Sequence, residues 1–257
     1  MSKREVNSII RSIQEQTLSF DPISLGESNT VALMKRFDTK FFFNTKQIPL
    51  ILATIKKDYQ ILEINQERVF PYITTYYDTP EMLMFNQHIN GKLNRYKIRY
   101  RKYISTNERY LEVKFKSNRQ KTSKKRILAD ENDSPLNLAD IKFIETETPI
   151  HPKGLQFIID TNFLRITLVS KKNKERATID FNLSFSNKKK QIELDHLSIL
   201  EIKKEGTHFS PLAECLRELQ IRPQGISKYC LGASLLYPSI KYNRMKAKIL
   251  QIQKINQ

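Results

Sequence analysis

A row of closely spaced cations runs through residues 95–101, which read RYKIRYR. Successive side chains of a β-strand point to opposite faces, so Arg95, Lys97, Arg99 and Arg101 would share one face. Neighbouring cations on such a face lie roughly 7 Å apart and repel by about 2 kcal/mol at an effective dielectric of about 20. The row therefore indicates either a fully solvated surface or a site built to hold closely spaced negative charges.

The same spacing of acid and base recurs on segments far apart in the chain. An acidic residue precedes a lysine by two positions in three predicted strands: Asp38 and Lys40, Glu112 and Lys114, Glu201 and Lys203. Antiparallel strands can bring such pairs to one surface, and a closed barrel would point them inward. We favour a polar tunnel interior, with a solvated open sheet as the alternative.

Composition limits the partners. A formal net charge of +17 indicates a phosphate-rich partner, namely nucleic acid, an anionic membrane surface, a nucleotide or an inorganic phosphate chain. None of the six glycines forms a loop of the kind that cradles phosphate with backbone amides, so side-chain cations must bind any polyphosphate.

The compartment follows from cysteine usage and hydropathy. The two cysteines, Cys215 and Cys230, have no spacing typical of a zinc site and indicate a reducing compartment. The N-terminal residues lack an apolar signal core, and no apolar run is long enough for a membrane span. We expect a cytoplasmic protein without a transmembrane segment.

Hydrophobic periodicity predicts a mixture of strands and helices. Strands are expected at 36–43, 70–80, 95–101, 111–116, 155–168, 176–185 and 191–205, and helices at 46–58, 210–219 and 226–238. Ser24 and Glu27 form a capping box for a helix that would end near Lys35, and a further helix is expected between loops in 128–154. We divide the chain into a lead-in helix and extension at 1–22, one domain at 23–243 and a basic tail at 244–257.

Several of these segments together resemble a known family. They read ISLGESNTVALMKRFDTKF, YYDTPEMLMFNQHINGKLNRYKIRYRKY, LEVKFKSNRQKTSKKR, TIDFNLSF, LEIKK and ISKYCLGASLLYPSIKYN. In this order they are similar to the motifs of the bacterial VTC domain, one of the triphosphate tunnel metalloenzymes, to which the CYTH phosphatases also belong. The resemblance runs from about Ile23 to Asn243. It implies an α+β fold in which an antiparallel eight-stranded β-barrel with flanking helices holds a triphosphate and a divalent metal.

The resemblance also implies roles for individual residues. Arg99, Arg101, Lys114 and Glu201 would carry catalysis, with Glu201 also binding Mn²⁺ or Mg²⁺. The other substrate-binding residues would be basic and would include members of the cation row and of the third acid-lysine pair. They are Lys40, Arg95, Lys97, Arg165, Arg176, Lys203 and Lys228. Lys124 or Lys125 would fill one further basic position. His88 aligns with a phosphate-contacting position when counted back from Arg99, and a polar loop histidine is the alternative interpretation.

One segment departs from the family pattern. Family members often read Tyr-x-Arg shortly after the position of Arg165, whereas this chain has Leu168, Val169 and Ser170, followed by Lys171. The departure removes one expected cation and predicts weaker activity or altered specificity.

The best-known family activity implies a polyphosphate polymerase that uses ATP to extend inorganic polyphosphate. A metal-dependent triphosphatase or polyphosphatase of the same fold is the alternative, as is a non-catalytic module that binds polyphosphate or RNA. Sheets that bind single-stranded nucleic acid place aromatic rings on the face with the cations, whereas Tyr96 and Tyr100 alternate with the arginines, so we expect no specific nucleic acid. The basic tail from Lys241 leaves a membrane-protein partner open.

Overall fold

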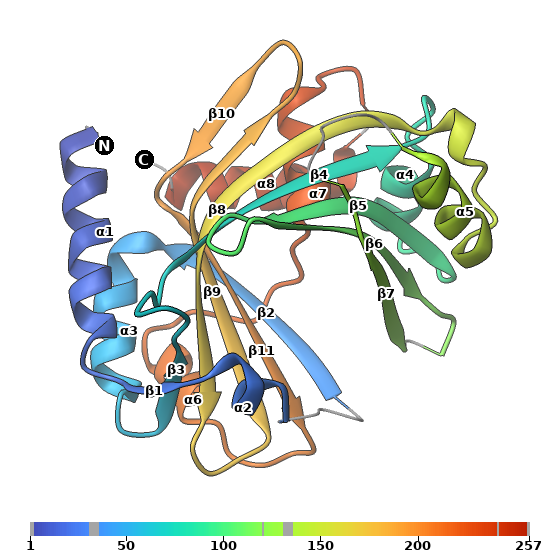
Figure 1. Ribbon diagram of the computed structural model, residues 1–257. Coiled ribbons are helices and arrows are strands. Elements are labelled where there is room, and N and C mark those ends of the chain that lie inside the picture. Colours follow the sequence, from blue (N-terminus) through green and yellow to red (C-terminus); the bar gives the residue numbers. More distant parts are fainter. Residues whose placement is uncertain (1–2, 31–35, 120, 131–135, 241, 256–257) are drawn as a thin grey trace.

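A strongly curved sheet dominates the computed structural model, which describes residues 3–30, 36–119, 121–130, 136–240 and 242–255 (Figure 1). Its eight main strands are antiparallel to their neighbours. Their spatial order is β2 (Arg36–Asn44), β11 (Leu197–Glu205), β9 (Glu175–Ser186), β8 (Gln156–Ser170), β4 (Phe70–Asp78), β5 (Arg95–Tyr103), β6 (Glu108–Lys116) and β7 (Thr122–Leu128). The predicted α+β fold is confirmed. The sheet curls as a half-barrel, and its edge strands β2 and β7 do not pair with each other within the described part of the chain.

Three short strands extend this sheet. β1 (Asp21–Ile23) pairs with β3 (Tyr59–Leu62), β3 pairs with β8, and β10 (Gln191–Leu194) pairs with β9. Strands β3 and β7 were not predicted from the sequence, and residues 191–205 were predicted to form one strand. The structure breaks that segment at a turn through Asp195 and His196, which reverses the chain so that β10 and β11 follow each other.

Two groups of helices cover the outer face of the sheet (Figure 1). On one arm, α1 (Lys3–Thr17), α3 (Ile48–Ile55) and α6 (Pro211–Glu218) bury residues such as Ile13, Leu52 and Leu216 against the apolar side of β2, β11, β9 and β8. On the other arm, α5 (Leu138–Glu147) packs Ile144 against β5 and β6. The outer face therefore forms the hydrophobic core, which leaves the polar side of the alternating strands facing inward.

A second core lies on the inner face, where α7 (Lys228–Leu236) and α8 (Asn243–Ile255) pack. The Cβ position of Gly232 in α7 lies 2.4 Å from a ring carbon of Phe185 in β9 and 2.7 Å from a methyl carbon of Ile159 in β8, so only glycine fits this approach. α4 (Leu83–Ile89) contacts α7. These helices fill one end of the inner face with apolar side chains, and the charged residues of the strands occupy the rest.

Local capping sets the ends of several helices. Glu27 accepts a hydrogen bond from the backbone amide of Ser24 (3.0 Å), and Ser24 accepts one from that of Glu27 (3.2 Å), which confirms the predicted capping box of α2 (Leu25–Thr30). Its expected end near Lys35 lies outside the described residues. Ser210 caps α6 as predicted. The predicted helix at 46–58 is a 3₁₀ turn, η1 (Thr45–Gln47), followed by α3, and η2 (Pro152–Gly154) is a second such turn.

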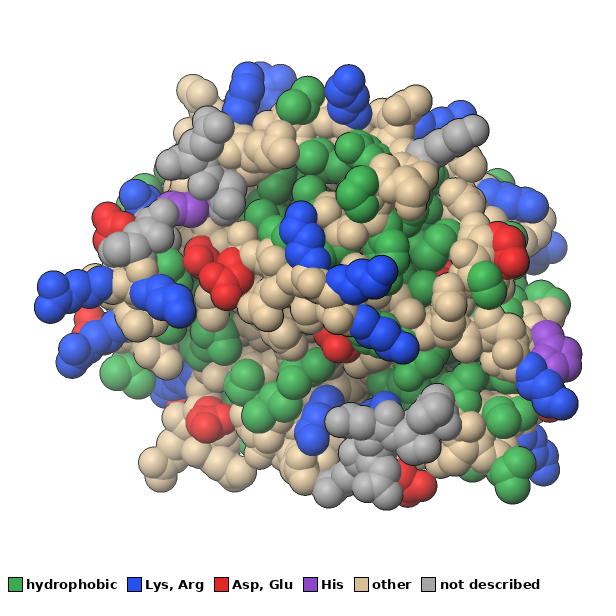
Figure 2. Space-filling view, turned by 90° about the horizontal axis from the view of Figure 1, so that it is seen from above, with side chains coloured by type: hydrophobic (Ala, Val, Ile, Leu, Met, Phe, Trp, Pro, Cys, Tyr) green, Lys and Arg blue, Asp and Glu red, His purple; other side chains and the backbone are tan. Residues whose placement is uncertain are grey.

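The predicted basic tail is helical over Asn243–Ile255, where α8 buries Met245, Ile249 and Ile252 against the inner core. Within the described ranges, no helix has the length and apolar character required to cross a membrane. Lys and Arg side chains are spread over the molecule and around its rim as seen from above (Figure 2). The domain boundaries at 22 and 243, the cytoplasmic location and the membrane-protein partner stay predictions.

Candidate functional site

The strand register gathers the predicted cations on the inner face. Residues directly opposite each other in an antiparallel pair point to the same side of a sheet. Arg99 lies opposite Glu112, Lys97 lies opposite Lys114, and Glu201 lies opposite Lys40. Lys97 donates a hydrogen bond to Ser227, at the start of α7, at 2.8 Å, so this is the side of the sheet on which α7 sits. Strands far apart in sequence thus contribute to one charged surface.

Glu112 forms ion pairs with two cations of the inner face, Arg99 and Lys124. Its side chain has no exposed surface, and it accepts bonds from Arg99 at 2.7 and 2.8 Å and from Lys124 at 3.0 Å. Burial alone would raise the pKa of Glu112, but the charges of Arg99, Arg101 and Lys124 hold it well below its usual range. Both carboxylate oxygens are occupied, so we assign Glu112 to positioning Arg99.

Asp180 does the same for a second pair. The Arg165 guanidinium donates to its two oxygens at 2.5 and 2.8 Å, and Lys228 of α7 also bonds to it. Burial opposes ionisation, yet Arg165 and Lys228 keep the pKa of Asp180 well below its usual value. Asp180 was not selected from the sequence as a site residue. Its partners lie 15 and 48 positions away, so only the topology reveals the role.

Glu201 has a different environment, because its ion-pair partners among the described residues are both lysines. Lys40 lies 2.6 Å away and Lys203 lies 3.5 Å away, and the Glu201 side chain is 15% exposed. Burial would raise its pKa, and the two lysines lower it overall. This is the one acidic side chain of the three whose contacts are flexible ammonium groups rather than a fixed guanidinium fork.

A divalent metal fits Glu201 as its protein ligand. Within the described part of the chain, no three His, Cys, Asp or Glu side chains cluster closely enough to hold a metal by themselves. Mg²⁺ commonly uses one or two carboxylates and completes its shell with water and substrate phosphates. Glu201 and a bound phosphate chain would supply such a set, whereas Glu112 and Asp180 are fully engaged.

Burial lowers the pKa of three lysines on the inner face, and two of them, Lys97 and Lys114, have no carboxylate partner among the described residues. Burial, followed by neighbouring cations, lowers the pKa of Lys114 to about 7, and the pKa values of Lys97 and Lys228 fall to about 8. Lys114 makes no hydrogen bond or ion pair with any described residue, although the charge of Glu201 favours its protonated form. The inner face is thus short of negative charge at its centre.

His88 adds a neutral group to this region. Burial and the charges of Lys97, Arg95 and Lys114 lower its pKa to about 2, and its Nδ1 atom is buried without a hydrogen-bond partner among the described residues. The structure therefore places His88 beside the cation row rather than in a distant loop.

Three further arginines predicted from the sequence differ in their contacts. Arg101 is buried, and its Nε donates to Thr74 at 3.4 Å. Arg176 lies opposite Lys203 on the inner side, and Arg95, opposite Lys116, donates to the carbonyl of Lys92.

The choice between Lys124 and Lys125 follows from β7. Lys124 reaches Glu112, whereas Lys125 points to the outer face and pairs with Glu147 of α5 at 2.8 Å. The strand phase of β7 therefore favours Lys124 for the one further basic position, and the role of either lysine in binding substrate stays a prediction. Lys171 does not replace the missing family cation, since it pairs with Asp21 at 2.6 Å.

Aromatic side chains on the inner face escaped the sequence analysis. Tyr96 and Tyr100 do lie on the outer side, but the neighbouring strands β4, β6 and β8 contribute other rings to the charged side. Arg99 lies over Tyr76 at 5.9 Å, and Arg101 lies over Tyr72 at 5.7 Å. The alternation in FPYITTYY at 70–77 could have shown that Tyr72 and Tyr76 share a face.

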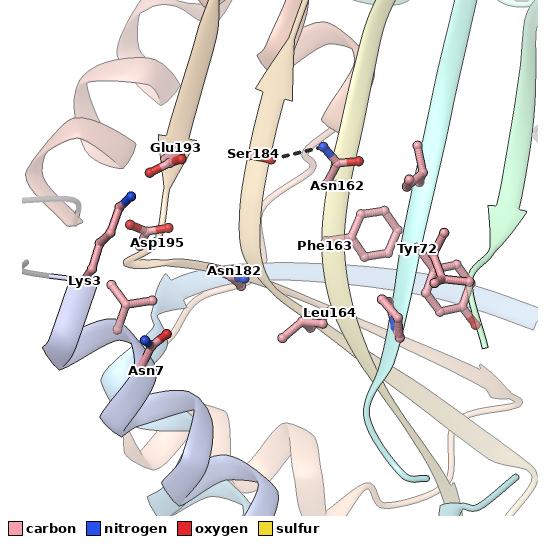
Figure 3. Close-up of a pocket in the computed structure, with 14 residues that line it drawn as sticks. Lys3, Asn7, Tyr72, Asn162, Phe163, Leu164, Asn182, Ser184, Glu193 and Asp195 are labelled. Atoms are coloured by element: carbon pink, nitrogen blue, oxygen red, sulfur yellow. Dashed lines mark hydrogen bonds between the residues drawn. The ribbon is translucent and has the colours of Figure 1, made fainter. Parts of the chain in front are cut away.

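A pocket of about 520 Å³ lies beside α1 and β10, and the rings of Tyr72 and Phe163 line it on the side nearest the cations (Figure 3). Lys3 and Asn7 of α1 lie on one side of it, together with Glu193 and Asp195. None of the residues predicted from the sequence to bind substrate lines this pocket. The chemistry indicated by the sequence is therefore that of the inner face.

Comparison with known proteins adds a family and several solved structures. The family model described as "VTC domain" matches residues 35–237. None of the curated proteins compared with the chain matches it. A putative adenylyl cyclase from Hippeastrum, described as having a dominant triphosphatase activity, is 11% identical and has a TM-score of 0.49, with 80% of this chain and 99% of that chain covered.

Two further solved structures are similar at the same level. A putative adenylate cyclase from Vibrio parahaemolyticus is 12% identical with a TM-score of 0.44, over 75% of this chain and 95% of that one. The PH1819 protein from Pyrococcus horikoshii is 14% identical with a TM-score of 0.45, over 77% and 96%. Because these TM-scores are below 0.5, the family assignment rests on the match over 35–237, and by that match the chain belongs to the VTC domain family.

Proposed function

We propose that this protein is a polyphosphate polymerase that transfers the γ-phosphoryl group of ATP to a growing chain of inorganic polyphosphate. Family membership supports a role in handling triphosphate or polyphosphate. The observation that carries the proposal is the poorly compensated charge of Lys97 and Lys114 beside Arg99, on a face formed by strands distant in sequence. A linear phosphate chain supplies the closely spaced negative charge that this face lacks.

Phosphoryl transfer passes through a loose transition state with charge spread over oxygens, so catalysis is mostly positioning and electrostatic stabilisation. Arg99 and Arg101 would grip phosphate oxygens with rigid guanidinium forks, while Lys40 and Lys114 add point charges. Glu112 fixes Arg99, and Asp180 fixes Arg165 and Lys228, so these cations are preorganised before substrate arrives.

Glu201 would hold Mn²⁺ or Mg²⁺ together with substrate oxygens. When bound, such an ion neutralises charge on the phosphates and polarises the group being transferred. The ammonium groups of Lys40 and Lys203, which now contact Glu201, would then turn toward phosphate oxygens. The attacking group decides the outcome: a phosphate chain end extends the polymer, whereas water cleaves the triphosphate.

The test is to incubate the purified protein with ATP and Mn²⁺, or with Mg²⁺, and to resolve the products on a gel that separates phosphate chains by length. The proposal predicts long chains. Glu201→Gln should reduce their formation at least tenfold while leaving the binding of phosphate chains nearly intact. Glu193→Gln, an exposed carboxylate of β10, is the matched control and should retain activity.

Three other results would replace the proposal. Orthophosphate alone would identify a triphosphatase of the same fold. Absence of turnover in both the unaltered protein and Glu201→Gln, with equal binding of phosphate chains, would identify a binding module. Retention of full chain synthesis by Glu201→Gln would remove Glu201 from the site.

A further inference from the structure

Four aromatic rings form a row across the inner face. They come from four adjacent strands: Tyr110 of β6, Tyr103 of β5, Tyr72 of β4 and Phe163 of β8. Consecutive ring centroids are 5.8, 5.1 and 5.4 Å apart, which is the range in which aromatic side chains pack favourably. Arg101 lies directly opposite Tyr110, so the row borders the cations.

The two ends of the row differ in their relation to α7. Phe163, at the β8 end, lies 4.6 Å from the ammonium nitrogen of Lys228, the first residue of α7, whereas Tyr110, at the β6 end, lies next to the edge strand β7. Along β5 the inward residues follow the order Lys97, Arg99, Arg101 and Tyr103. Lys97 contacts Ser227 at the start of α7, where the apolar core closes the inner face. A triphosphate held by Arg99 and Lys114 would therefore extend its non-phosphate end toward the aromatic row.

At the β6 end of this row, the guanidinium of Arg126 lies over the ring of Tyr110. Its guanidinium carbon lies 4.4 Å from the ring centroid, and the Tyr110 hydroxyl donates a hydrogen bond to Glu108 at 3.0 Å, which fixes the ring. Arg126 is exposed on β7, a strand that pairs on one side only within the described part of the chain. The outer surface of the guanidinium therefore faces solvent.

A similar pair on the other face of the sheet shows what a structural stack looks like. Arg109 lies 4.0 Å above Tyr100, but Arg109 is buried and bonds to the backbone carbonyl of Asp130. Arg126 is exposed and carries no such backbone bond among the described residues. Core packing accounts for the first stack and not for the second.

We infer that the Tyr110–Arg126 stack binds the nucleobase of a nucleoside triphosphate whose phosphates lie among the inner cations. This inference rests on the proposed function, because it requires the triphosphate to be held there. Nucleobases stack on aromatic rings and on arginine planes, and such stacking discriminates little between bases. The site should therefore take ATP and GTP about equally and bind either more tightly than inorganic tripolyphosphate.

The experiment compares dissociation constants for ATP and for inorganic tripolyphosphate by calorimetry. Arg126→Lys keeps the charge but removes the plane, so it should weaken ATP about tenfold and change tripolyphosphate by no more than about twofold. Tyr110→Leu should have a similar selective effect. Arg119→Lys, at an exposed turn after β6, is the matched control and should change neither ligand.

A fluorescent etheno-adenine analogue of ATP gives a second readout. Its emission should be quenched on binding to the unaltered protein, and much less on binding to Arg126→Lys. This signal reports on the base itself, so a general loss of fold or charge does not imitate it when tripolyphosphate affinity is retained.

The possible results separate the two proposals. Equal affinity of the unaltered protein for ATP and tripolyphosphate, or equal losses for both ligands in Arg126→Lys, would overturn the base site and leave the phosphate site standing. Failure of both ligands to bind would overturn the proposed function and the base site together. Binding of single-stranded RNA lacking a triphosphate as tightly as ATP, with the same loss in Arg126→Lys, would assign the stack to nucleic acid instead.

Discussion

Three carboxylates on one face show how side chains of the same kind take different tasks. Glu112 and Asp180 each hold a guanidinium at hydrogen-bonding distance, whereas the ion-pair partners of Glu201 in the described part of the chain are lysines. Removing either of the first two would leave buried cations unpaired, which is strongly destabilising. Glu201 can exchange its partners more cheaply, because ammonium groups on flexible stems can turn to a new anion.

Lys114 gives a pH test at this scale. Its pKa of about 7 in the free protein means that it is largely neutral at pH 9, and an anion beside it raises that pKa. Binding must then take up protons, so affinity for tripolyphosphate should fall about tenfold or more between pH 7 and pH 9. Calorimetry in buffers of different ionisation enthalpy measures this uptake directly.

Lys114→Arg is the matching variant, because an arginine stays protonated throughout this range. The variant should bind tripolyphosphate with a clearly flatter pH profile, with the remaining slope coming from Lys97 and Lys228, whose pKa values are about 8. An unchanged profile would show that Lys114 does not contact the anion.

Sequence reasoning at the residue scale succeeded where the information was local. Alternation within 95–101 and 112–116 predicted which cations share a face, and the register places Arg99, Glu112 and Lys114 accordingly. It did not find Asp180 as a site residue or Tyr72 as a neighbour of the arginines, because these contacts depend on the register between paired strands and on where α7 packs, which the alternation within one strand does not give. The choice between Lys124 and Lys125 stayed open for a related reason, since β7 was not predicted and it was unknown which of its residues point inward.

Helix α7 links the apolar and charged parts of the inner face at the scale of elements. Its first residue, Lys228, reaches Asp180, and Tyr229 donates to Asp78, which also accepts from the backbone amides of Met84 and Phe85 at the start of α4. Further along, Gly232 allows the helix to approach β8 and β9 closely. The position of Lys228 therefore depends on packing one turn away.

Gly232→Ala tests this dependence. The added Cβ would lie 2.4 Å from a Phe185 ring carbon, so α7 or the ring must shift, at a cost of about 1–3 kcal/mol in the free energy of unfolding. Thermal melting should show a Tm lower by several degrees. Gly225→Ala, where no atom lies within 4 Å of the new Cβ, is the control, and equal melting of the two variants would contradict the close approach.

Elements with their own sequence signals were predictable, and those defined by tertiary context were not. Ser210 followed by Pro211 marked the start of α6, and the capping box marked α2. The four residues of β3 carry no comparable signal. They become a strand because they pair with the part of β8 that extends beyond its pairing with β4.

At the scale of the whole molecule, the basic side chains behind the net charge of +17 divide into surface residues and inner cations. Many of the basic side chains lie on the surface, where salt at physiological strength screens them over about 8 Å. The inner cations differ, because they are partly buried, closely spaced and fixed by Glu112 and Asp180. Specific binding of a phosphate chain should therefore depend on these few positions rather than on the total charge.

The most direct test of a specific phosphate site on the inner face is calorimetric titration with inorganic tripolyphosphate. It compares the unaltered protein with two variants that carry the same net charge as each other. Arg101→Met with Lys114→Met removes two inner cations that have no carboxylate partner among the described residues, and Lys188→Met with Lys189→Met removes two exposed ones. We expect one binding site, a loss of at least about 100-fold in the first variant and less than about twofold in the second. Equal losses in both would show that the protein attracts phosphate only through its overall charge and has no site on the inner face.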